Sequence, residues 1–173
     1  MRNVFRLLFI GVLLFALSGV VSAAEDIPGF KGYTWGTGFE VIHQEKDLKL
    51  IKTVDGVSNC LGKKDSEFDT QGRPAAGYVY RFYNNKLVAG DIVFFNQSRY
   101  VEAVKVLEIK FGKPVVMMDG KSLSYNFANT TIYCVSEDRK IYFASREYLD
   151  DDYKRNKEAD KVKNDHNFNK IFN

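Results

Sequence analysis

Histidine and cysteine are scarce in this chain, with two of each among 173 residues. The histidines, His43 and His166, stand far apart, and neither has a second ligand at the spacing of a zinc motif. Because a structural zinc site needs four ligands, the sequence predicts no metal and no cofactor. A glycine-rich phosphate loop and a Gly-x-Ser-x-Gly elbow are also missing, which argues against nucleotide binding and against a serine hydrolase.

The chain has no marked excess of one charge. Lys and Arg number 25 against 22 Asp and Glu, and two of the basic residues, Arg2 and Arg6, lie in a segment that we expect to be removed. The remaining chain is nearly neutral, with 23 basic and 22 acidic residues. Nucleic-acid binding depends on clustered positive charge, so we do not expect a nucleic acid as partner.

The first 23 residues have the features of an export signal. Arg2 and Arg6 precede an apolar run over 7–21, and small residues follow, so that cleavage after Ala23 or after Ala24 fits. The run is shorter than the roughly 20 residues of a spanning helix, and no cysteine follows it for lipid attachment. We therefore predict a mature protein that has no transmembrane segment and is periplasmic or secreted.

Both cysteines, Cys60 and Cys134, lie in the mature part of the chain. Two cysteines in an oxidising compartment favour a disulfide bond between them. Two buried free thiols are the alternative, because spacing in the sequence does not fix the distance between the Cα atoms.

The hydrophobic patterns predict an α+β fold in one domain over 24–149. We expect a first helix with Thr37 and Glu40 as a capping box, and a second helix from Ser98 to a stop at Gly112. The expected strands cover 48–54, 57–61, 77–83, 86–95, 115–118, 122–127, 130–135 and 140–145. They predict an antiparallel sheet of six to eight strands with both helices packed on it. The order also suggests a duplicated α-β-β-β unit.

Residues 150–173 differ in composition from the rest and are rich in charge. We expect a charged C-terminal helix, with the acidic run 150–152 in its first turn, where the helix dipole favours acids. A disordered tail is the alternative.

Two short segments resemble parts of small secreted bacterial proteins of uncharacterised families. One runs from Phe30 to Val41 and includes the Trp-Gly-Thr sequence before the first helix, and the other, from Val106 to Pro114, ends the second helix with aromatic-Gly-Lys-Pro. The layout of elements over 30–145 is also similar to the folds of β-lactamase inhibitor proteins and of the small outer-membrane assembly lipoprotein. The resemblance implies a fold that presents a sheet or helix face to another protein, and it assigns no functional residue. The lipid-attachment cysteine of the lipoprotein is missing here.

Aromatic residues are frequent on the expected strands, and alternation divides them between two faces of the sheet. Tyr78, Tyr80 and Phe82 share one face, while Arg81 and Tyr83 share the other. We take these five residues as a candidate binding face, because tyrosine and arginine are enriched in protein interfaces. Coverage of the second face by a helix or a second sheet layer is the alternative.

These observations predict an exported, non-enzymatic protein whose partner is another exported protein. The rival function is a small hydrolase that uses two carboxylates on an envelope polymer, with candidate acids at Glu40, Asp91, Glu102 and Glu108. A carrier of a small apolar ligand is a third hypothesis. Catalysis by Cys60 with His43 as its base is disfavoured, because a disulfide would remove the thiolate.

Overall fold

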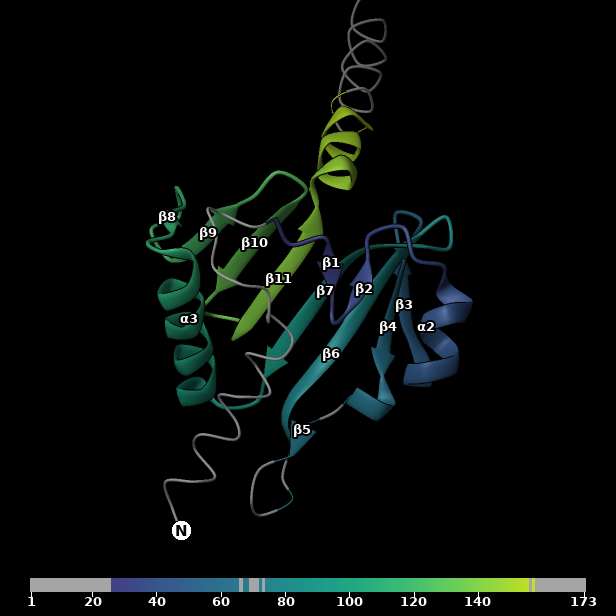
Figure 1. Cartoon of the computed structure of the whole chain (residues 1–173), viewed down its shortest axis with the longest axis horizontal. Helices are drawn as coiled ribbons and strands as arrows, with labels where there is room; N and C mark the ends of the chain where they lie inside the picture. Colours follow the sequence, from purple (N-terminus) through teal and green to yellow (C-terminus); the bar gives the residue numbers. More distant parts are fainter. Residues whose placement is uncertain (1–25, 66, 69–71, 73, 156, 158–173) are drawn as a thin grey trace, which may run out of the picture.

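The computed structural model describes residues 26–65, 67–68, 72, 74–155 and 157 (Figure 1). The expected export signal over 1–23 and the chain from residue 158 onward lie outside these residues. The described part contains a nine-stranded antiparallel sheet and a separate two-stranded hairpin, and helices pack on the larger sheet. This confirms the α+β class, with one strand more than the six to eight expected, because β5 has only two residues and leaves no pattern in the sequence.

The large sheet has the strand order β3-β4-β6-β7-β11-β10-β9-β8, with β5 beside β6. Its strands are β3 (Leu48–Val54), β4 (Val57–Gly62), β5 (Glu67–Phe68), β6 (Pro74–Tyr83), β7 (Lys86–Phe94), β8 (Val115–Val116), β9 (Ser122–Asn126), β10 (Thr130–Val135) and β11 (Lys140–Ser145). The remaining elements are β1 (Gly29–Phe30), β2 (Tyr33–Thr34), the helix α2 (Phe39–Lys46), the single turn η1 (Lys63–Asp65) and the helix α3 (Gln97–Phe111).

The sheet consists of two similar halves. In the first half, α2 precedes the meander β3-β4-β6-β7, and in the second half α3 precedes the meander β8-β9-β10-β11. The final strands of the two halves pair at the centre, where Ile92 of β7 is opposite Ile141 of β11. The expected duplicated unit is therefore present in the order of elements, with one more strand in each half than the α-β-β-β pattern predicted.

Two short turns set the register of the first half. Asp55 and Gly56 join β3 to β4, and Asn84 and Asn85 join β6 to β7, and all four residues have positive φ. Two consecutive positive φ values define the type I′ turn, whose twist matches that of a β-hairpin. Asn and Gly tolerate this backbone at little cost, which explains why the sequence located both turns.

The first helix begins at a different cap from the one expected. Gly38 is the N-cap of α2 and makes no side-chain cap hydrogen bond. The Thr37 hydroxyl donates instead to the carbonyl of Thr34, 2.7 Å away. The predicted capping box of Thr37 and Glu40 is therefore wrong, because the hydroxyl closes the preceding turn.

The second helix follows its prediction apart from its first turn, because it begins at Gln97 and Ser98 is not its cap. Its N-cap is Asn96, whose Oδ1 accepts a hydrogen bond from the amide of Ser98. The helix ends at Gly112, which has φ of 80°, a conformation that favours glycine. The buried side chains of its stripe include Tyr100 and Leu107.

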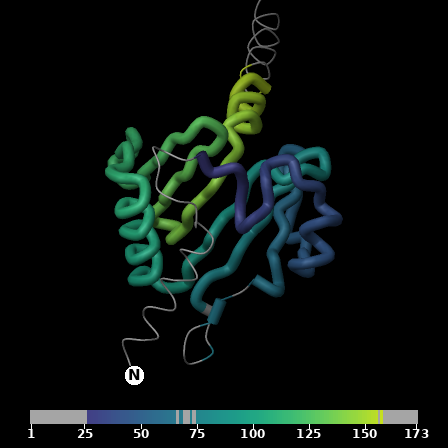
Figure 2. The backbone as a smooth tube through the Cα atoms, in the orientation of Figure 1, coloured from purple at the N-terminus to yellow at the C-terminus, as the bar shows by residue number. Residues whose placement is uncertain are grey.

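One face of the sheet, here called the helix face, forms the core. The chain before α2 crosses this face between the two helices (Figure 2), and its Phe30 packs edge-on against Tyr80, with ring centroids 5.3 Å apart. Phe39 of α2 packs against Phe82 in the same way. The core joins these side chains to buried residues of both helices and of β10 and β11, so α2, α3 and the β1–β2 hairpin all pack on one face.

The cysteines are free and fully buried, so the expected disulfide between Cys60 and Cys134 is not present. Both side chains are on the helix face, but Cys60 lies on β4 and Cys134 on β10. Four strand spacings separate these strands, which places the residues about 19 Å apart, far beyond the limit of about 7 Å between bridged Cα atoms. The compartment argument failed because it does not fix where the two strands lie in the sheet.

Residues 146–155 form a helix that follows β11 directly. It starts earlier than the expected residue 150, and the rest of the predicted C-terminal helix or tail lies mostly outside the described residues. None of the helices that the structure describes has the length and apolar content needed to cross a bilayer.

Candidate functional site

Three residues of the predicted binding face belong to the core. Tyr78, Tyr80 and Phe82 are each at most 2% exposed, because the hairpin and α2 cover them. Alternation was right in grouping them, but they form no binding surface. This part of the prediction is corrected.

The hydroxyl groups of the two core tyrosines have local acceptors. Tyr80 donates to the carboxylate of Asp65, and Tyr78 donates to that of Glu67. Burial, followed by these hydrogen bonds, raises the pKa of both tyrosines well above the ordinary value. Both hydroxyls are therefore protonated at neutral pH and act as structural donors.

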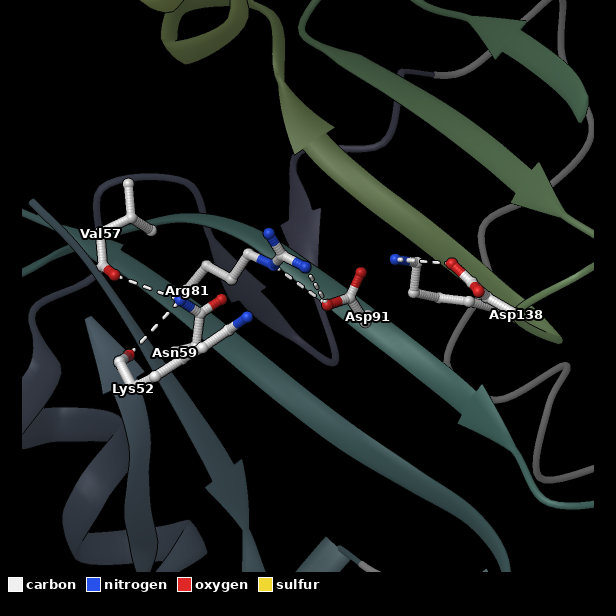
Figure 3. A network of polar contacts seen from close by, with 7 residues as sticks. Lys52, Val57, Asn59, Arg81, Asp91 and Asp138 are labelled. Carbon is white, nitrogen blue, oxygen red and sulfur yellow. Dashed lines mark hydrogen bonds and ion pairs between the residues drawn. The ribbon is translucent and has the colours of Figure 1, made fainter. Parts of the chain in front are cut away.

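Arg81 and Tyr83, the other two predicted residues, lie on the opposite face of the sheet. We call this the polar face. The strand pairings place five residues on it: Asn59, Arg81, Asp91, Tyr133 and Tyr142. Figure 3 shows Asn59, Arg81 and Asp91 following one another across neighbouring strands. Asn59 donates to the carbonyls of Lys52 and Val57, which fixes it against the first hairpin.

A buried ion pair lies at the centre of the polar face. Nε and Nη2 of Arg81 donate to Oδ2 of Asp91 at 3.0 and 2.6 Å. The Asp91 side chain is only 3% exposed, whereas that of Arg81 is 29% exposed. Burial raises the pKa of Asp91, and the nearby Arg81 opposes this shift. The second carboxylate oxygen, Oδ1, is buried without a hydrogen-bond partner among the described residues.

Arg81 also begins a stack of side chains that crosses the sheet. Its guanidinium lies 4.9 Å from the ring centroid of Tyr142 on β11. Tyr142 in turn stacks on Tyr133 of β10, with centroids 6.0 Å apart and planes at 20°. Tyr133 and Tyr142 are a directly opposed pair of the two strands, so the backbone register holds their rings in parallel.

A shallow pocket of about 390 Å³ adjoins this stack. Its wall is formed by Arg81, Met117, Asp119, Ser122, Tyr133, Val135, Lys140 and Tyr142. These residues come from β6, β9, β10, β11 and the loop after β8. The pocket therefore combines residues of both halves of the fold, which only the complete sheet brings together.

Three polar residues of the pocket wall, Asp119, Ser122 and Lys140, already have partners. Asp119 accepts hydrogen bonds from the amides of Lys121 and Ser122 and from the Ser122 hydroxyl. These bonds lower the pKa of Asp119 to about 2, chiefly through Ser122. Lys140 lies 3.7 Å from the carboxylate of Asp138. The loop is thus held in shape by its own contacts, and its charged groups are largely neutralised.

Exposed apolar side chains continue from the edge of the pocket. Val115 and Val116 of β8 are each about 60% exposed, and Met118 is fully exposed. The next residue towards the sheet, Met117, lines the pocket. Val115 is opposite Ser124, which pairs with Tyr133, so its side chain shares the polar face, whereas Val116 is opposite Leu123 and faces the helix side. Val115 and Met117 thus place apolar side chains at one end of the polar face.

The helix over 146–155 covers another part of the polar face. Tyr148 packs against Tyr83 with centroids 6.2 Å apart. The Arg155 guanidinium lies 4.6 Å from the Tyr83 ring and 5.8 Å from the Tyr148 ring. Tyr83, the last of the predicted face residues, is therefore engaged by the chain's own helix.

The four candidate carboxylates do not form a pair. Glu40 lies in the first turn of α2, while Glu102 and Glu108 are exposed on α3, and these helices lie at opposite ends of the sheet (Figure 1). Asp91 alone is on the polar face, where it is 2% exposed and bonded to Arg81. The arrangement lacks the facing acids of a glycosidase.

His43 and the cysteines form no catalytic or metal site. His43 lies on α2 and stacks on Phe39 at 5.2 Å, and burial raises the pKa of Cys60 above its ordinary value, which disfavours the thiolate. The described residues contain no group of three or more metal-ligating side chains placed to hold an ion. His166 lies outside them.

The sequence did not indicate Tyr133 and Tyr142 as site residues. Each lies in an alternating pattern of polar and apolar neighbours, as do Tyr78 and Tyr80, so the local sequence does not separate the half-buried tyrosines from the fully buried ones. The useful signal was the short turn between the strands at 130–135 and 140–145, which makes Tyr133 and Tyr142 opposed partners in a hairpin.

Comparisons with known proteins give little further information. No family model and no curated protein matches the chain. A cysteine-rich secretory protein from Staphylococcus aureus subsp. aureus Mu50 is structurally similar with a TM-score of 0.42 and 13% identity, over 76% of this chain and 52% of that one. The chain thus spans about half the length of that structure. A similarity at this TM-score establishes neither a shared fold nor a shared function.

Proposed function

We propose that this protein binds another protein through the polar face of its sheet, at the pocket beside Tyr133 and Tyr142. The observation that carries the proposal is the stack of Arg81, Tyr142 and Tyr133 next to a pocket that is rimmed by exposed apolar side chains. Tyrosine, arginine and methionine are the side chains enriched in the centres of protein interfaces.

The rigidity of the surface supports the same function. The site residues stand on hydrogen-bonded strands, and the Arg81–Asp91 pair and the Tyr133–Tyr142 stack fix their side chains. A side chain that is ordered before binding loses little conformational entropy on binding. The polar face can therefore serve as an interface without rearrangement of the sheet.

The compartment of the partner follows from the N-terminal sequence. The segment over 1–23 has the features of a cleaved export signal, so we expect the partner to be another exported protein in the periplasm or outside the cell. The hydrolase hypothesis has weaker support, because the residues that line the pocket include one carboxylate, Asp119, and no second acid to face it.

Site-specific photo-crosslinking tests this function. A photoreactive phenylalanine at position 135, in the pocket, is compared with the same group at position 109, on the exposed helix surface of α3, where Ile109 is 86% exposed. Cells that express each mature chain in its own compartment are irradiated, and the products are identified by mass spectrometry. We expect one dominant protein adduct from position 135 that is lacking at position 109.

The crosslinking experiment needs a binding-deficient variant as its control. Arg81→Glu reverses the charge at one end of the stack and should remove the adduct at position 135, while Lys154→Glu, on the exposed surface of the helix over 146–155, should preserve it. Equal adducts from positions 135 and 109, or an adduct that survives Arg81→Glu unchanged, would contradict the proposed interface.

A further inference from the structure

We infer that the pocket receives an aromatic side chain of the partner, which stacks on the face of the Tyr133 ring turned away from Tyr142. The inference rests on the proposed function and names the group that the interface recognises. It depends on the geometry of the stack, on the residue that follows Tyr133 in the sheet, and on the state of the polar groups at the rim.

The stack ends at Tyr133. Arg81 covers one face of Tyr142 and Tyr133 covers the other, so both faces of the Tyr142 ring are occupied. Within the described residues, Tyr142 is the only ring or cation in contact with Tyr133. Because Tyr142 lies on the β11 side, the second face of the Tyr133 ring is directed toward β9 and the pocket.

The sequence of β9 keeps this space free of a further ring. The residue opposite Tyr133 on β9 is Ser124, whose small side chain is buried and does not extend the stack. Met117 and Val135 supply apolar walls beside the Tyr133 ring. A thioether next to an aromatic ring is a favourable contact. An inserted ring would therefore have the Tyr133 ring on one face and an apolar side chain of the wall beside it.

Three polar residues at the rim, Asp119, Ser122 and Lys140, favour a ring over a saccharide because their polar groups are already engaged. A sugar needs several free donors and acceptors for its hydroxyl groups. Asp119 is occupied by its three hydrogen bonds, the Ser122 hydroxyl donates to Asp119, and Lys140 is near Asp138. An aromatic side chain makes few such demands and gains from stacking, which adds about 0.5–1.5 kcal/mol beyond the buried area.

Small amides of single amino acids test the inference directly. The mature protein is titrated with N-acetyl-tryptophanamide, N-acetyl-tyrosinamide or N-acetyl-leucinamide, and NMR follows the Met117 methyl group and the Tyr133 ring. We expect the two aromatic probes to bind more tightly than the leucine probe by about twofold to twelvefold, the ratio that such a stacking energy gives. Upfield shifts of the Met117 methyl signal would report a ring beside it.

Variants separate stacking from simple burial. Tyr133→Phe should keep the preference for the aromatic probes, and Tyr133→Ala should abolish it. Met117→Ala changes an exposed loop and should weaken the aromatic probes without unfolding the sheet. Tyr153→Ala, on an exposed tyrosine of the last helix, is the matched control and should leave all affinities unchanged. Thermal unfolding of each variant verifies that it is folded.

The outcomes distinguish the two proposals. If the photo-crosslinked partner is found but the leucine probe binds as well as the aromatic probes, the aromatic anchor is wrong and the interface stands. Stronger binding of chitotriose than of any amide would replace the aromatic side chain by a saccharide. If aromatic probes bind Tyr133 but position 135 captures no protein, the pocket assignment stands and the protein partner is wrong.

Discussion

At the residue scale, Asp91 shows how burial and pairing compete. Burial disfavours its carboxylate, and the two hydrogen bonds from Arg81 favour it, with burial as the larger effect. The pKa of Asp91 is therefore higher in the folded protein than its ordinary value of 3.8. The folded protein retains this proton at pH values where the unfolded chain has lost it.

This shift gives a pH dependence with a defined sign. Between the ordinary carboxyl pKa and the raised one, the folded state binds more protons than the unfolded state, so stability falls as the pH rises. We expect the Asp91→Asn variant not to show this fall in stability with rising pH, because its amide does not titrate. Wild type should thus become less stable relative to the variant as the pH increases from about 4 to 7.

Urea unfolding at a series of pH values measures the difference between the two proteins. Glu137→Gln, which changes an exposed carboxylate, is the control and should follow wild type. A difference between wild type and Asp91→Asn that stays constant with pH would show that Asp91 has no raised pKa.

The cysteines give a second prediction at this scale. Burial raises the pKa of Cys134 to about 12, and Cys60 is equally inaccessible. Both thiols should resist iodoacetamide in the folded protein and react fully in urea, so that mass spectrometry finds two adducts without prior reduction. A chain that gains its adducts only after reduction would contain the disulfide that the sheet order excludes.

At the scale of elements, Gly90 permits the β1–β2 hairpin to pack on the sheet. A Cβ atom at this position would lie 2.2 Å from Cδ1 of Phe30, well inside van der Waals contact. Gly90 is opposite Tyr80 in the sheet, and Phe30 packs on that tyrosine. The missing side chain therefore provides the space for the ring of Phe30.

We expect Gly90→Ala to destabilise the protein by about 1–3 kcal/mol, the usual cost of an overpacked core. Gly77→Ala is the matched control in β6, because its Cβ atom would meet Phe95 and Leu61 at ordinary distances of 3.8 and 3.9 Å. Gly77→Ala should leave the free energy of unfolding unchanged or raise it by up to about 1 kcal/mol. The urea midpoints of the two variants decide the matter, and equal midpoints would contradict the role of Gly90.

Local patterns predicted most elements of this fold. The turns at Asp55-Gly56 and Asn84-Asn85, the stripe of α3 and its stop at Gly112 all depend on neighbouring residues, and the structure confirms each of them. The capping box failed where a second local hydrogen bond, from Thr37 to Thr34, competed with the cap. Contacts between residues that are close in the sequence can thus be predicted, except where one side chain has two nearby partners that compete for it.

The candidate site was less predictable because it depends on which face is covered. Alternation correctly separated Tyr80 from Arg81, but only the long-range contact of Phe30 with Tyr80 identifies the core face. The stack of Arg81 on Tyr142 likewise depends on β7 pairing with β11. Neither contact leaves a signal in the residues near it in the sequence.

At the scale of the whole molecule, the order of strands predicts where stability is greatest. β7 and β11 lie at the centre of the sheet, and β3 and β8 lie at its edges. Six of the seven residues of β3 are exposed. Regions with few buried contacts open most readily, so opening should begin at the edges and spread inward.

Amide hydrogen exchange tests this order. We expect the amides of Ile92 and Ile141, which form a central pair, to exchange through global unfolding and to be the slowest. Amides over 49–54 should exchange faster through local opening. Protection of β3 equal to that of β7 would show that the sheet opens as a single unit.

The central pairing of β7 with β11 also determines when a nascent chain can complete its fold. In a chain that emerges from its N-terminus, β7 is complete at Phe94, but its neighbour in the sheet begins only at Lys140, so the first half emerges with one long strand edge unpaired. Such an edge is a template for pairing with other chains. A chain that stops before Lys140 therefore exposes this edge permanently, and synthesis of the last strand is the step that protects the protein from aggregation.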